Sequence, residues 1–246
     1  MDTTWQITWD SCSLLLDPWL VGSEVDGFSW FNVQWHATPP VPISEIGTFQ
    51  GIIVSQSYSD HCHKETLEAL PETEILSTPS AFKRLKKELP SRSIRTLPSL
   101  ESNNWMEFEE LSLTYIDPHR KIDPIYNGIV IRKGGEAIVY FPHGFTLNDT
   151  QLSLLRPLKI QLLITSFSLF RLPSFLGGDV NPGQKNAMAL VRQLDPLHVV
   201  HTHDENKHAR GLVKKIAKVV YPDPDRLKNE LAGRYSYLQY EAMEII

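Results

Sequence analysis

The sequence predicts a mixed α/β (α+β) sandwich, and three features support that fold class. Short apolar strands dominate, and helical segments are interspersed between them. The strands occur both as hairpins and in strand–helix alternation, which favours mixed sheets over a doubly wound parallel sheet. The 246 residues are 41% hydrophobic and 22% charged, which is enough for a full core and too balanced for a disordered chain.

The first half of the chain is expected to begin with strands. Trp5, Ile7 and Trp9 alternate with polar residues, as in a half-buried strand. Thr78 followed by Pro79 is typical of a helix start. The expected elements are strands within 5–20, a long loop over 23–48, a strand at Ile52–Val54, a helix at Lys64–Leu70, a short strand at Ile75–Leu76 and a helix from Thr78.

The second half alternates more regularly between strands and helices. Lys133-Gly134-Gly135 joins two apolar runs and indicates a hairpin. Asn181-Pro182 is a helix-start signal, and Ala187, Leu190 and Val191 recur at helical spacing. The expected elements are strands at Leu111–Ile116, Gly128–Arg132, Ala137–Phe141, Leu162–Ile164 and His198–His201, and helices at Asn181–Leu194, near Gly211–Val219 and from Asp225 onward.

Composition excludes several classes of protein. Two cysteines are too few for a disulfide scaffold or a four-cysteine zinc module. The net charge of −5 argues against a nucleic-acid binder, which is usually basic. No apolar stretch is long enough to span a membrane, and the N-terminus shows no secretory signal. We therefore expect a cytoplasmic protein with a single domain over residues 1–246, whose oligomeric state stays open.

Histidines at the ends of apolar strands suggest a metal site. These histidines lie at the ends of four separate predicted strands, and strand ends at one sheet edge are where ligand sites gather. Imidazole and carboxylate are ligands for zinc, iron and manganese. The alternative for any one histidine is an ordinary hydrogen-bonded residue. The candidates are Asp60, His61, His63, His119, His143, His201 and His203, with Cys62 among them.

The order of elements resembles the metallo-β-lactamase superfamily. Leu14-Leu15-Leu16-Asp17-Pro18-Trp19-Leu20 is similar to the early strand of its small cytoplasmic members. Residues 52–67 stand where the superfamily has its hallmark strand and HxHxDH loop, 138–144 resemble a later strand, and 196–203 resemble the final strand that ends in a ligand histidine. The resemblance implies a four-layer αβ/βα sandwich and metal-dependent hydrolysis.

The hallmark loop is degenerate in this sequence. Its first two histidines fall on Gln56 and Tyr58, whereas Asp60 and His61 match its last two positions. A glutamine amide and a protonated phenol are poor ligands, so one of the superfamily's two metal sites is not expected here. The resemblance assigns the other site to Asp60, His61, His143 and His203. His119 and His201 are further candidate ligands.

The resemblance therefore implies one divalent ion, with zinc as the first choice and manganese or iron as alternatives. The expected function is hydrolysis of a small-molecule ester, lactone or phosphodiester by a metal-activated water. Asp60 or His63 is expected to move the proton, and Gln56, Tyr58 and Lys207 to contact the substrate. The competing hypothesis is a non-catalytic member of the fold that binds a ligand or partner at the same edge. For Lys207, the alternative is an ordinary solvated helix start.

Overall fold

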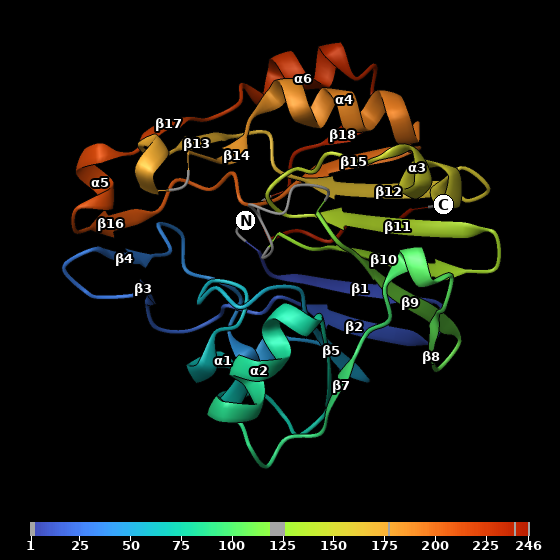
Figure 1. The fold of residues 1–246 in the computed structure, drawn as a ribbon, viewed down its shortest axis with the longest axis horizontal. Helices are drawn as coiled ribbons and strands as arrows, with labels where there is room; N and C mark the ends of the chain where they lie inside the picture. Colours follow the sequence, from blue (N-terminus) through green and yellow to red (C-terminus); the bar gives the residue numbers. More distant parts are fainter. Residues whose placement is uncertain (1–2, 119–125, 177, 239, 246) are drawn as a thin grey trace.

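The fold is described from a computed structural model, which defines residues 3–118, 126–176, 178–238 and 240–245. Two large sheets face each other and helices cover their outer faces (Figure 1). The helices are α1 (Lys64–Ala69), α2 (Pro79–Glu88), α3 (Asp149–Leu155), α4 (Gln184–Leu194), α5 (Val213–Ile216) and α6 (Pro224–Glu230), with 3-10 turns η1 (Ile43–Glu45), η2 (Leu100–Ser102) and η3 (Ser174–Leu176).

The first large sheet has the order β1-β2-β5-β6-β7. β1 pairs antiparallel with β2, and the remaining neighbours pair in parallel. Every residue of β2 is buried, because this strand has a neighbour on each side and is covered on both faces. The strands are β1 (Trp5–Trp9), β2 (Cys12–Leu16), β5 (Gly51–Val54), β6 (Glu74–Ser77) and β7 (Ile94–Thr96).

The second large sheet has the order β18-β15-β12-β11-β10-β9-β8 and mixes the two pairing modes. β8 to β11 form an antiparallel meander, while β11, β12, β15 and β18 run parallel. Its strands are β8 (Met106–Phe108), β9 (Leu111–Ile116), β10 (Gly128–Lys133), β11 (Glu136–Phe141), β12 (Lys159–Thr165), β15 (His198–His201) and β18 (Tyr235–Ser236).

Three apolar clusters hold these layers together. The central cluster lies between the sheets, with Leu14 and Ile53 from one and Tyr140 and Ile164 from the other. A second cluster packs α1 and α2 on the first sheet, and a third packs α3, α4 and α6 on the second. The expected mixed-sheet, four-layer architecture is thus confirmed (Figure 1).

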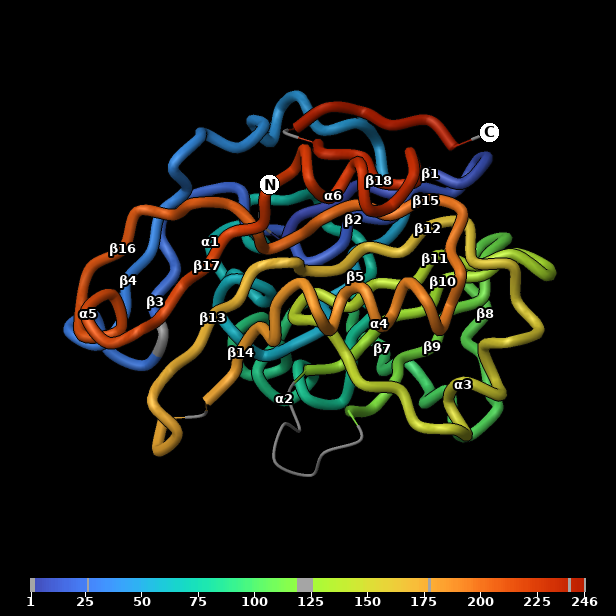
Figure 2. Tube along the Cα trace, turned by 90° about the horizontal axis from the view of Figure 1, so that it is seen from above, coloured from blue at the N-terminus to red at the C-terminus, as the bar shows by residue number. Residues whose placement is uncertain are grey.

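Two small sheets lie at one end of the molecule, where the sequence predicted a loop and a helix (Figure 2). The expected loop over 23–48 contains β3 (Glu24–Asp26) and β4 (Asn32–Trp35), and β4 pairs with β16 (His208–Arg210). The helix expected near Gly211–Val219 is only α5, and it is followed by β17 (Lys218–Val220). β17 pairs with β13 (Leu169–Arg171), which also pairs with β14 (Asp179–Pro182). Strands of three or four residues are too short for a local periodicity to show, and two of these pairings, β4 with β16 and β13 with β17, join distant parts of the chain.

Two other helix boundaries differ from expectation. α4 begins at Gln184, after Gly183 with φ of +83°, because residues 179–182 pair as a strand. α6 ends at Glu230, so the helix expected from Asp225 onward does not reach Tyr235, Tyr237 and Tyr240. In the described ranges, no helix combines the length and hydropathy that a membrane crossing requires.

Candidate metal centre

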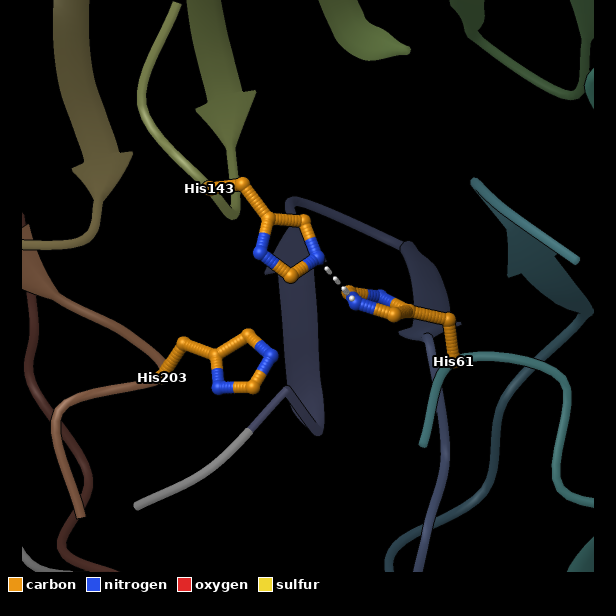
Figure 3. A group of neighbouring side chains, drawn as sticks. All are labelled: His61, His143 and His203. Atoms are coloured by element: carbon orange, nitrogen blue, oxygen red, sulfur yellow. Dashed lines mark hydrogen bonds between the residues drawn. The ribbon is translucent and has the colours of Figure 1, made fainter. Parts of the chain in front are cut away.

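Three histidines from the two large sheets converge at one edge of the sandwich (Figure 3). His61 lies on the loop after β5, His143 follows β11 and His203 follows β15. One ring nitrogen of each lies within 4.8 Å of the others, and both His61 and His143 are buried. The sequence predicted this convergence from strand ends.

The buried carboxylate of Asp17 orients the His61 ring. Asp17 Oδ2 lies 2.7 Å from His61 Nδ1 and accepts from the hydroxyl of Tyr140 at 2.9 Å. Ser55 donates to the same carboxylate from both its backbone N–H and its hydroxyl. A carboxylate only accepts hydrogen bonds, so its contact with His61 assigns the proton to Nδ1 and leaves Nε2 with a lone pair toward the cluster.

The amide of Asn181 fixes the His143 ring in the same way. Asn181 Oδ1 lies 2.6 Å from His143 Nδ1, and its Nδ2 donates to Ser166 and Ser168. These partners assign the amide oxygen to His143, so Nδ1 is again the protonated nitrogen. His143 Nε2 therefore also presents a lone pair.

The Nε2 lone pairs of His61 and His143 face each other, and the distance between the two nitrogens shows whether a metal ion fits between them. His61 Nε2 and His143 Nε2 are 3.0 Å apart, an arrangement that is favourable only with a cation between them. A tetrahedral zinc ion with Zn–N bonds of about 2.0–2.1 Å holds its nitrogens about 3.3 Å apart. The donor set therefore fits a divalent ion.

Asp60 and His203 complete the cluster. His203 Nε2 is 2.9 Å from Asp60 Oδ2, and Asp60 Oδ1 is 3.8 Å from His61 Nε2. His203 has φ of +58°, a left-handed conformation that is uncommon outside glycine and often found at functional sites. The Lys207 ammonium lies 3.9 Å from Asp60 Oδ2 and against the Trp19 ring.

The electrostatics of the cluster favour the neutral form of His143 and the ionised form of Asp60. Burial, together with the neighbouring His203 and His61, holds the pKa of His143 well below its usual range. Burial alone would raise the pKa of Asp60, but the adjacent His61 and His203 and the Lys207 ammonium lower it well below its usual value. Both are the protonation states that metal ligands require.

A family model described as the beta-lactamase superfamily domain matches residues 2–203. The chain belongs to this superfamily. No curated protein sequence matches it.

Solved structures of the superfamily fold share low sequence identity with the chain. An isothiocyanate hydrolase from Delia radicum gut bacteria is 15% identical with a TM-score of 0.69, covering 100% of this chain and 97% of that one. A possible metal-dependent hydrolase from Veillonella parvula DSM 2008 is 13% identical with a TM-score of 0.74 and the same coverage. Igni18, a metallo hydrolase from Ignicoccus hospitalis KIN4/I, is 14% identical with a TM-score of 0.61, covering 99% and 92%. At this identity the likeness supports the fold.

Two of the histidines predicted for the superfamily site lie outside the cluster. His63 caps α1: its Nδ1 accepts from Thr66 N–H, its Nε2 lies 3.3 Å from Ser23 O, and burial lowers its pKa. His201 Nε2 contacts the backbone of Leu238, and burial lowers its pKa to about 4. His119 lies outside the described residues. Proton transfer by His63 and metal binding by His201 or His119 stay predictions.

Gln56 and Tyr58 occupy the positions where the superfamily loop has its first histidines. The Gln56 side chain is fully buried, and neither its amide oxygen nor its nitrogen has a hydrogen-bond partner among the described residues. The Tyr58 ring lies 6.1 Å from that of Tyr126, which in turn lies 4.7 Å from the His143 ring. Their contact with substrate stays a prediction.

The sequence did not predict the residues that orient the ligands. Asp17 was taken only as a strand end, and Asn181 as a helix cap, although each holds one imidazole. Asp17 has φ of +43°, and an aspartate before proline at the end of the apolar run Leu14–Leu16 is the signal that could have identified it. A cavity of about 1000 Å³ runs along β1 and residues 240–245 and includes none of the cluster imidazoles. The candidate site is therefore identified from the arrangement of its ligand atoms and not from a cavity.

Proposed function

We propose that this protein is a metal-dependent hydrolase of small molecules with one divalent ion bound by Asp60, His61, His143 and His203. The observation that carries the proposal is the convergence of three imidazole nitrogens within 4.8 Å, two of which present lone pairs to each other. We propose zinc as the ion, with manganese or iron as alternatives, because three imidazoles and one carboxylate suit all three.

A divalent ion in this site would supply a Lewis acid that polarises the scissile group and lowers the pKa of a water. The protein's own residues prepare the site for it. Asp17 and Asn181 keep the protons of His61 and His143 on the nitrogens that face away from the cluster. Asp60 is the carboxylate that faces the Nε2 atoms of His203 and His61, at 2.9 and 3.8 Å, and it would accept a proton from the attacking water.

The proposed substrates are esters, lactones and phosphodiesters. Lys207 supports this class, because its ammonium lies beside Asp60 and can hold an anionic or carbonyl oxygen. Isothiocyanates belong in the same assay, since a structural neighbour hydrolyses them and the reaction likewise adds water to an electrophilic carbon.

The experiment is metal analysis followed by an activity panel. Purified protein should hold about one ion per chain, and His143→Ala or His203→Ala should weaken binding by more than about 100-fold, because losing a residue that merely orients a ligand already costs about 10–100-fold. His208→Ala is the matched control, since His208 is an exposed histidine on β16. Hydrolysis that persists unchanged in Asp60→Asn and His203→Ala would exclude this site.

A metal-free binding protein is the second candidate, and one observation favours it. The cluster residues also contact one another directly, through His61 with His143 and His203 with Asp60. In that case one shared proton takes the place of the ion. Stoichiometric metal that is lost in His143→Ala and retained in His208→Ala decides against this candidate.

A further inference from the structure

The end of the molecule that carries the two small sheets concentrates the exposed apolar side chains. This end, which we term the docking end, consists of residues 24–35 with β3 and β4, η3, and residues 208–221 with β16, α5 and β17, and it lies at the left in Figures 1 and 2. Among the described residues, eight of the ten exposed large apolar side chains belong to it or follow it directly. Phe28 and Trp30 are each 65% exposed and Phe175 is 83% exposed. Exposed apolar patches of this kind mark interaction surfaces.

Contacts between distant segments hold the docking end together. The backbone N–H of Leu212 donates to Trp30 O at 3.1 Å, and that of Val213 donates to Phe31 O at 3.0 Å. Gly211 permits this close approach, because a Cβ at its position would lie 2.5 Å from Phe31 O. The rings of Phe28 and Trp30 stack with an interplanar angle of 10°. The turn between β3 and β4, which carries Phe28 and Trp30, is therefore held by the backbone of residues 211–213.

The segment of this end that contains α5 and β17 is basic, although the chain as a whole is acidic and β3 carries Glu24 and Asp26. Residues 206–222 contain five lysines and arginines and no aspartate or glutamate, in a chain of net charge −5. Four of the five are exposed and flank the apolar residues: Arg210, Lys214, Lys215 and Lys218. Asp179 on the neighbouring β14 is paired with Arg171.

Exposed Trp and Phe beside Lys and Arg are the combination that proteins use at the interface of anionic membranes, where the rings enter the headgroup region and the cations meet the lipid phosphates. We propose that the docking end binds an anionic membrane surface. A second copy of this chain is a poorer occupant, because a two-fold contact would bring the basic residues of both copies together.

The docking end also borders the candidate metal centre. Val25, Phe28 and Trp30 line a cleft of about 510 Å³, and Tyr58 and Ser59 line the same cleft. Ser59 donates to the buried Glu24 of β3 and immediately precedes Asp60. Docking would therefore set this cleft against the lipid surface, whether or not the protein is a hydrolase.

The test is sedimentation of the full chain with vesicles of phosphatidylcholine mixed with phosphatidylserine, compared with pure phosphatidylcholine vesicles. We expect binding to the anionic vesicles that falls steeply with added salt and is the same with and without divalent metal. Lys214→Gln with Lys215→Gln should weaken binding by about 25-fold, at about fivefold per lysine. Phe28→Ser with Trp30→Ser should weaken it by at least about tenfold.

Matched controls are available on other faces. Lys86→Gln with Lys87→Gln removes two exposed lysines from α2, and Leu197→Ser removes an exposed apolar side chain outside the docking end. Both should bind vesicles as the native chain does. The proposal is overturned if the native chain stays in the supernatant with both vesicle types, even if it associates with itself or with an acidic polypeptide. It is also overturned if the control variants lose as much binding as the docking-end variants.

Discussion

Replacing Asp17 with asparagine should weaken metal binding by about 10–100-fold, the usual effect of losing a group that orients a metal ligand. The carboxylate holds the His61 proton on Nδ1 at 2.7 Å and leaves Nε2 for the ion. An amide retains the shape of the side chain, and asparagine tolerates the φ of +43° at this position. What changes is the charge and the number of hydrogen-bond acceptors.

The cost to stability follows from the same contacts. If the amide oxygen takes the place of Oδ2, which faces His61 and Tyr140, the amide NH₂ faces the backbone N–H of Ser55. The Ser55 N–H and the amide N–H of the new asparagine then both lack an acceptor, at about 1–3 kcal/mol each. The metal-free variant should therefore lose about 2–6 kcal/mol of unfolding free energy. Tyr140→Phe, which removes one donor from the carboxylate, should lose about 1.5–3 kcal/mol.

The assays are zinc competition against a fluorescent chelator and urea unfolding of the metal-free protein. Asp10→Asn is the control, because it makes the same change at an exposed position that also has a left-handed backbone, with φ of +52°. It should alter stability by no more than about 0.5 kcal/mol. Asp17→Asn with the zinc affinity of the native chain would refute the assignment of His61 as a ligand held by Asp17.

Three further outcomes are expected. Gln56→His combined with Tyr58→His should raise the metal content from about one ion toward two per chain in elemental analysis, and an unchanged content would show that these positions do not limit it. Lys207→Met should tighten zinc binding several-fold in the same competition assay, because it removes a positive charge 3.9 Å from Asp60; weaker binding would contradict this. Burial, helped by nearby glutamates, raises the pKa of the Cys12 thiol, so iodoacetamide at mildly alkaline pH should label Cys12 only after unfolding, and fast labelling of the native chain would show that the thiol is accessible.

The sequence predicted the parts of the fold that depend on local pattern. The apolar runs before His61, His143 and His203 are strands of the two large sheets, and their ends do meet at one edge. The strands β3 and β16 were not predicted, because each has only three residues, and β16 depends on pairing with β4 across most of the chain.

The candidate site was predictable to a similar extent. A histidine at a strand end is visible as a residue type in a pattern. The hydrogen bond from His143 to Asn181 is not, because asparagine before proline is equally typical of a helix start. His63 illustrates the converse: it lies two residues from His61, yet its ring turns to Thr66 and caps α1. Neighbouring residues in a loop face different directions, and spacing alone does not show which.

The ligands are divided between the two sheets, with His61 from the first and His143 and His203 from the second. An ion held by all three would therefore cross-link the two halves of the sandwich without a covalent bond. At a free metal concentration 100-fold above its dissociation constant, this adds about 2.7 kcal/mol to the folded state, a substantial share of the 5–15 kcal/mol that is typical of a domain. Metal starvation would then shorten the lifetime of the folded chain against proteases as well as remove any activity.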